Sequence, residues 1–231
     1  MVRKLVLMVF VIGLAAVAFG GVEQVRAQSG KERITIEVEP RMRAQDLIRE
    51  LRAKELIPSG GSQQMSVPRT VINVRNQGFW YFPLGRGTQL SDFVLHFELR
   101  AQELPSETNG CGMVFRAIDD DNFSYVMLTK DRRIVLVQLD RGEEIVAFDQ
   151  SIDDLEGLDA TNYELDETQL HIITLIAYGN ELTLFLNGVE ITYETTARSV
   201  RGRFATMLFN EEGNPSNTEC RYSNVFAWNL P

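Results

Sequence analysis

Only two histidines are available for catalysis, His96 and His171, and both lie inside alternating segments typical of β-strands. A nucleophilic triad needs a serine or cysteine motif beside the histidine, and the sequence offers none. Two histidines far apart in sequence also lack the close ligand spacing of a zinc site. We therefore interpret both as ordinary sheet residues and predict no catalytic residue.

An acidic segment offers a different chemistry, because Asp119, Asp121 and Asn122 carry the hard oxygen ligands that calcium prefers. Calcium takes six or more oxygens, whereas this segment supplies two or three. Acidic turns are also a common connection between strands. A calcium site and a plain turn both remain open, and we predict no other cofactor.

The N-terminus has the outline of an export signal. Arg3 and Lys4 precede an uncharged run, Leu5–Gly21, and Val25-Arg26-Ala27 then offers a cleavage site before Gln28. The run is long enough to compete with a retained membrane helix, so residues 1–27 are either a signal peptide or an N-terminal anchor. Either way the remainder is expected to be secreted or extracytoplasmic, with membrane contact only through an uncleaved segment.

The two cysteines, Cys111 and Cys220, are interpreted in the light of this export signal. An oxidising compartment favours a disulfide, and in the chain-entropy model closing so long a loop would stabilise the domain by several kcal/mol. The alternative is two buried free thiols. We predict the disulfide because export is indicated independently.

Composition and charge limit the function classes. The chain has 231 residues, 44% hydrophobic and 24% charged, which suits one full-sized folded domain. Its net charge is −9, and without residues 1–27 it becomes −11. An acidic domain with no basic patch is a poor nucleic-acid binder, so we predict no nucleic-acid partner.

Residues 28–69 are predicted to form an extension and linker. Ile34, Ile36 and Val38 alternate as in a short strand, and a helical repeat of apolar residues follows up to Pro58-Ser59-Gly60-Gly61. The helical repeat consists of Ala44, Leu47, Ile48 and Leu51. This piece is too small to fold alone, so its apolar stripe must pack on the main domain or on a partner, and we expect the main domain.

Residues 70–231 are predicted to be all-β. In Phe93–Leu99 alternate residues are apolar, as in a sheet with one buried face, and Asn187-Gly188 is a strong hairpin signal. Twelve strand-like segments with short connections and no crossover helix require two stacked antiparallel sheets, a jelly-roll sandwich. The segments are Val71–Val74, Phe79–Phe82, Phe93–Ala101, Gly112–Ile118, Phe123–Thr129, Ile134–Leu139, Glu144–Phe148, Gln169–Tyr178, Glu181–Leu186, Val189–Glu194, Gly202–Phe209 and Arg221–Trp228.

Several of these segments resemble the concanavalin A-like lectin/glucanase superfamily. More narrowly, they are similar to its laminin-G-like branch and to the 3-keto-disaccharide hydrolase/family 16 glycoside hydrolase-like domains. The segments that carry the resemblance are Asp92–Leu99, Gly112–Arg116, Asp119–Val126, Leu182–Gly188 and Tyr222–Trp228. The resemblance spans residues 70–231 and is more specific for fold than for function.

Retaining glucanases of this superfamily carry Glu-x-Asp-x-Glu or Glu-x-Asp-x-x-Glu on one strand, which places two carboxylates on one face. The nearest segment here is Glu164-Leu165-Asp166-Glu167, and no second glutamate follows in register. The sequence therefore does not support glucanase chemistry by this route.

Arg116 is the candidate ligand-binding residue. Met113 and Phe115 share one face of their strand, which by alternation puts Arg116 on the exposed or concave face. In the resembled family an arginine at this place lines the ligand-facing surface. With Tyr125 or Trp80 it would bind sugar hydroxyls by hydrogen bonds and stacking, whereas a solvated strand arginine is the alternative.

The resulting hypothesis is a non-catalytic extracytoplasmic module that binds carbohydrate or a cell-envelope surface. The first alternative is a glycoside hydrolase-like enzyme acting on a modified disaccharide or glucan. The second is a structural or assembly subunit of an envelope complex, which would have a protein partner.

Overall fold

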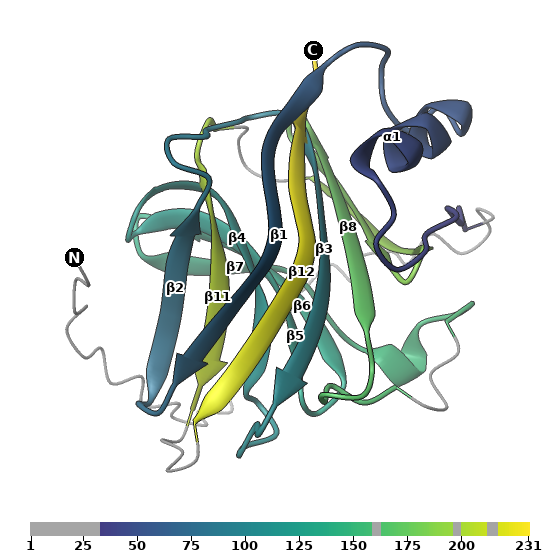
Figure 1. Ribbon diagram of the computed structural model, residues 1–231. Coiled ribbons are helices and arrows are strands. Elements are labelled where there is room, and N and C mark those ends of the chain that lie inside the picture. Colours follow the sequence, from purple (N-terminus) through teal and green to yellow (C-terminus); the bar gives the residue numbers. More distant parts are fainter. Residues whose placement is uncertain (1–32, 159–162, 196–199, 212–216) are drawn as a thin grey trace, which may run out of the picture. The chain divides into compact units, whose positions relative to one another are not determined.

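The protein is described by a computed structural model covering residues 33–158, 163–195, 200–211 and 217–231, and it forms a sandwich of two antiparallel sheets (Figure 1). Sheet A has the order β1-β12-β3-β8-β9-β10 and sheet B the order β2-β11-β4-β5-β6-β7. The predicted all-β jelly-roll class is confirmed. The strands are β1 Ser62–Val74, β2 Gly78–Leu84, β3 Phe93–Gln102, β4 Gly110–Asp119, β5 Asn122–Thr129, β6 Arg133–Asp140, β7 Glu143–Ser151, β8 His171–Tyr178, β9 Glu181–Leu186, β10 Val189–Thr195, β11 Arg203–Asn210 and β12 Thr218–Asn229.

The core lies between the sheets and follows from the alternation in the strands. Phe93 and Phe97 on β3 point inward from sheet A, and Met113 and Phe115 on β4 point inward from sheet B. Phe93 packs edge-on against Phe115, with ring centroids 6.0 Å apart. These side chains are at most 1% exposed, so the two apolar faces are fully removed from water.

A disulfide joins the two sheets through this core. Cys111 on β4 of sheet B is bonded to Cys220 on β12 of sheet A, with Cα atoms 5.8 Å apart and a sequence separation of 109. Both residues are fully buried. The predicted disulfide is confirmed.

Residues 33–57 form a strap over the outward face of sheet A. Helix α1, Ala44–Ala53, turns Leu47, Ile48 and Leu51 toward the sheet, and Figure 1 shows it beside β8. The predicted packing of this segment on the sandwich is therefore observed. A 3₁₀ turn, η1 Ile152–Asp154, follows β7.

The predicted strand Ile34–Val38 is reduced to a single bridge, between Thr35 and Val189. Its two backbone hydrogen bonds run from Ile36 N to Gly188 O and from Glu190 N to Ile34 O. β1, in contrast, already begins at Ser62, before the predicted start of the sandwich at residue 70. Its polar first residues pair with the end of β12, which no alternation signal revealed.

Within the described ranges, no helix is long and apolar enough to cross a bilayer. The predicted signal peptide or anchor, residues 1–27, lies outside these ranges.

Candidate functional site

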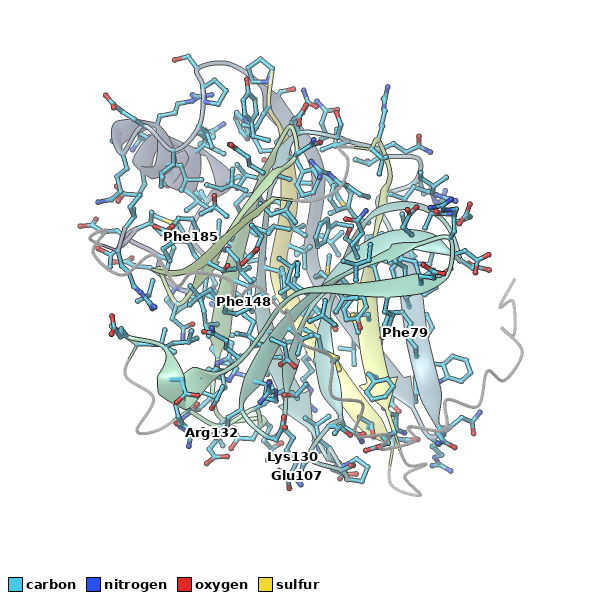
Figure 2. The ribbon with its side chains drawn as sticks, turned by 180° about the vertical axis from the view of Figure 1, so that it is seen from behind. Phe79, Glu107, Lys130, Arg132, Phe148 and Phe185 are labelled. Carbon is cyan, nitrogen blue, oxygen red and sulfur yellow. A yellow bond between two sulfur atoms is a disulfide. The ribbon has the colours of Figure 1, made fainter. Side chains whose placement is uncertain are left out.

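The outward face of sheet B carries a cluster of four aromatic rings. Phe79 and Tyr81 come from β2, and Phe123 and Tyr125 come from β5; we call these four residues the aromatic cluster. Phe79 lies 5.3 Å from Tyr125 and 5.6 Å from Phe123 between ring centroids, and Tyr81 lies 6.0 Å from Phe123. Figure 2 views the molecule from the sheet B side and labels Phe79.

The rings of β2 and β5 meet over two intervening strands, β11 and β4, at a level where β4 carries a glycine. Tyr81 pairs with Met207 on β11, which in turn pairs with Gly112 on β4. A Cβ at Gly112 would lie 1.9 Å from Val126 O, so only glycine fits there. Val114 and Met207 are 0% exposed, so the rings and their neighbours cover the middle of the face.

A carboxylate stands at the rim of the cluster. Tyr81 Oη donates a hydrogen bond to Asp120 Oδ1 in the β4–β5 turn. Burial, and next this hydrogen bond, raise the pKa of Tyr81 to about 12. Burial also raises the pKa of Tyr125, and the nearby Glu144 contributes in the same direction.

The β4–β5 turn is held by its own side chains. Asp119 Oδ1 accepts hydrogen bonds from Asn122 Nδ2 at 2.7 Å and from Asp121 N at 3.0 Å. These hydrogen bonds, that of Asn122 first, lower the pKa of Asp119. Asn122 Oδ1 accepts from Arg141 N at 3.1 Å, which fixes the turn to the β6–β7 hairpin.

The predicted calcium ligands Asp119, Asp121 and Asn122 do lie together in this turn. In the part of the chain that the structure describes, no group of three His, Cys, Asp or Glu side chains is placed to hold a metal. One carboxylate oxygen of Asp119 is already used inside the turn. Calcium binding therefore stays a prediction.

The expectation that Arg116 lies on an exposed face is wrong. Arg116 is 2% exposed, and its side chain reaches the loops at one end of sheet A, where Nε and Nη2 donate to Ser91 O at 3.0 and 2.8 Å. Nη2 also donates to Gly179 O at 2.8 Å, and the guanidinium lies 5.9 Å from the ring centroid of Phe93. The guanidinium thus holds the two sheets together at this end of the sandwich.

A β-bulge explains the reversal. The register between β4 and β11 shifts between Arg203 and Ala205, and Arg116 opposite has a φ of 52°. An extra residue breaks the alternation of faces, so the side chain after Phe115 turns inward. Strand alternation correctly predicts that Met113 and Phe115 share the inward face, but it fails at Arg116, one residue later.

Trp80 and Tyr125 lie on opposite faces of sheet B. Trp80 packs against the core between the sheets, and its Nε1 donates to Asn76 O at 3.2 Å. The structure therefore does not bring Arg116, Tyr125 and Trp80 together. Sequence reasoning missed Phe79 and Tyr81, although they are the residues that alternate with the inward Trp80 and Phe82.

Both histidines are buried strand residues. His171 Nε2 bonds to Glu164 O at 2.8 Å, and His96 Nδ1 bonds to Thr174 Oγ1 at 2.9 Å. Asp166 Oδ1 accepts from Thr168 N at 2.7 Å and so shapes the loop before β8. That acidic segment is a connection and not a strand.

No protein-family model and no curated protein matches the sequence. The carbohydrate binding module CBM66 from Bacillus subtilis superposes with a TM-score of 0.52 at 13% identity, over 69% of this chain and 94% of that chain. The β-glucanase of Bacillus licheniformis has a TM-score of 0.50 at 9% identity, over 76% and 89%. The chain has the concanavalin A-like fold.

Part of a fructosyltransferase from A. japonicus also superposes, with a TM-score of 0.51 at 16% identity over 80% of this chain and 29% of that chain. Identities this low establish the fold alone. In this concanavalin A-like chain, the outward positions of the described strands β11, β4 and β5 carry no acidic side chain at the aromatic cluster. They are occupied by Ala205, Met207, Gly112, Val114, Phe123, Tyr125 and Met127.

Proposed function

We propose that the protein is an exported, non-catalytic module that binds carbohydrate on the outward face of sheet B. The observation that carries the proposal is the aromatic cluster with a carboxylate at its rim. Sugar rings stack their C–H faces on aromatic side chains, and a carboxylate accepts hydrogen bonds from sugar hydroxyls. Phe79 and Tyr81 are only partly buried and supply the accessible ring surface.

Export is supported by two independent features. The basic and then uncharged N-terminus is typical of a secretion signal, and the Cys111–Cys220 disulfide is of the kind that persists in oxidising compartments. Non-catalytic binding is supported by the apolar strand positions under the cluster, because retaining glycosidases need two carboxylates about 5 Å apart.

The test is titration of the pure protein, residues 28–231, against neutral β-glucans, fructans and chitin oligomers by calorimetry. Phe79→Ala and Tyr81→Ala are each expected to weaken binding about tenfold, the loss of roughly one stacking contact. Tyr178→Ala is the matched control, because Tyr178 is 46% exposed on sheet A, away from the cluster. If the unmodified protein binds none of these glycans, the proposal fails.

A protein or envelope surface is the second candidate ligand. Ile145 and Val146 on the edge strand β7 are 46% and 56% exposed, and Val146 pairs with Val137 beside Tyr125. Val146 extends the apolar surface of the aromatic cluster, and a larger exposed apolar patch favours contact with a macromolecular surface. Val146→Glu would abolish such contact, whereas small glycans stacked on Phe79 and Tyr81 would bind as before.

A further inference from the structure

The strap and the sandwich have separate apolar cores. Leu47, Ile48 and Leu51 of the strap pack on Val94 and Phe185 of sheet A, in a cluster distinct from the one between the sheets. Figure 2 labels Phe185 on the side of the molecule where α1 lies. Removing the strap would therefore uncover one face of sheet A without opening the core that holds the two sheets together.

His96 lies on the face that the strap covers. It is 0% exposed, its ring stacks on Phe226 with centroids 4.8 Å apart, and Nδ1 bonds to Thr174 Oγ1. Nε2 is buried without a hydrogen-bond partner. A protonated imidazole has two N–H donors, so beneath the strap one of them would have no acceptor.

The side chains in contact with the His96 ring carry no charge. β8 contributes Thr174 and β12 contributes Phe226, while the buried side of α1 consists of Ala44, Leu47, Ile48 and Leu51. Glu98 is the next residue on the same face of β3, and its carboxylate accepts hydrogen bonds from the strap and from β12, not from His96. Burial alone lowers the pKa of His96 to about 3.

Glu98 fastens the strap to the sheet. Its carboxylate accepts hydrogen bonds from Arg41 N, from Ser223 Oγ at 2.7 Å and from Asn224 Nδ2 at 3.2 Å. Asn224 Nδ2 also donates to Met42 O at 2.9 Å. Two residues of the strap are thus held by a buried polar network next to His96.

We propose that the strap is an acid-released latch: protonation of His96 detaches residues 33–57 from sheet A while the disulfide-linked sandwich stays closed. The segment between the strap and β1 can serve as the hinge of this latch, because Gly60 and Gly61 have φ values of 101° and 82°. Among the described residues, one β-bridge joins the strap to a strand, Thr35–Val189. Release exposes the apolar face around Val94, Ile176, Phe185 and Phe226.

The direction of the pH dependence follows from linkage. His96 is neutral in the closed form with a lowered pKa, whereas in the released form it has its ordinary pKa of about 6.5. Closure is therefore independent of pH above about 6.5 and weakens as pH falls from there toward 3. The equilibrium should move about tenfold toward release for each pH unit in that window.

Hydrogen exchange of the pure protein, residues 28–231, from pH 7.5 to 4 tests the latch, after correction for intrinsic exchange rates. The opening equilibrium of α1 should increase about tenfold per pH unit below about 6, while that of β3 and β8 stays constant. His96→Phe and His96→Gln should remove this slope, and His171→Gln, the matched control, should retain it. Glu98→Gln should raise opening at every pH and leave the slope unchanged.

Two results would overturn the proposal. One is that α1 and the core strands lose protection together, which would be global acid unfolding. The other is that both His96 variants, folded by circular dichroism, keep the slope of the unmodified protein.

Discussion

Tyr81 on β2 and Asp120 in the β4–β5 turn are 39 residues apart in sequence and are joined by a hydrogen bond across the end of β11. This contact ties the edge strand of sheet B to the acidic turn and fixes the orientation of one ring of the aromatic cluster. It also places a carboxylate next to an aromatic surface.

The ionisation of Tyr81 reports this contact. Its pKa of about 12 should fall in Asp120→Asn but stay above the ordinary value near 10, because burial is the larger cause. Ultraviolet difference absorbance against pH measures it, with Tyr81→Phe giving the background of the other tyrosines. An unchanged pKa in Asp120→Asn would show that the two groups are not bonded in solution.

The disulfide should dominate the stability of the sandwich. Replacing both Cys111 and Cys220 with alanine opens a loop with a sequence separation of 109, which the chain-entropy model values at about 5 kcal/mol. Urea denaturation measures the loss, and the reduced unmodified protein is the control. A loss below about 1 kcal/mol would mean that the loop is already constrained in the unfolded chain.

Arg116 is expected to act on stability and not on binding. Arg116→Met leaves the carbonyls of Ser91 and Gly179 without their donor and should cost about 2–4 kcal/mol of unfolding free energy. Arg69→Met, at an exposed position of β1, should stay within about 0.5 kcal/mol. A folded Arg116→Met protein with unchanged stability but abolished glycan binding would contradict this assignment.

Alanine substitutions at two turn glycines distinguish the cost of backbone strain from the cost of a clash with the strap. Gly179 and Gly188 both have positive φ, 58° and 85°, and a Cβ at Gly179 meets nothing within 4 Å. At Gly188 a Cβ would lie 2.4 Å from Ile36 O. Gly179→Ala should therefore cost about 1 kcal/mol, from strain alone.

Gly188→Ala should cost more than this and should also increase hydrogen exchange in the strap, because the backbone at Ile36 must move. Thermal unfolding compares the two variants, and exchange of the amides in residues 33–57 locates the effect. Equal losses in both, with an unchanged strap, would show that the contact at Gly188 is dispensable.

The fold could be predicted from the sequence because each strand carries its own periodicity. Phe93–Leu99 alternates cleanly, and Asn187-Gly188 forms the expected turn, with φ values of 49° and 85°. The first half of β1 could not be predicted in this way. Its residues Ser62–Ser66 are mostly polar, and they become a strand only because β12 offers a partner.

The candidate site was less predictable, because it depends on interruptions of the pattern. Arg116 turns inward at a bulge that leaves no mark in the hydrophobic alternation. The meeting of Phe79 with Tyr125 depends on strand order, since β2 and β5 are brought together by β11, which comes much later in the chain. Strict alternation within β2, applied to the sequence, would have placed Tyr81 and Trp80 on opposite faces of the sheet, as the structure does.

The last strand of the chain, β12, sits inside sheet A between β1 and β3 and carries one half of the disulfide. During synthesis, β3 can pair with β8, but β1 has no partner in sheet A until Thr218–Asn229 has left the ribosome. A growing chain of this kind can complete sheet A, and with it the bond between the two sheets, only at the end of its synthesis.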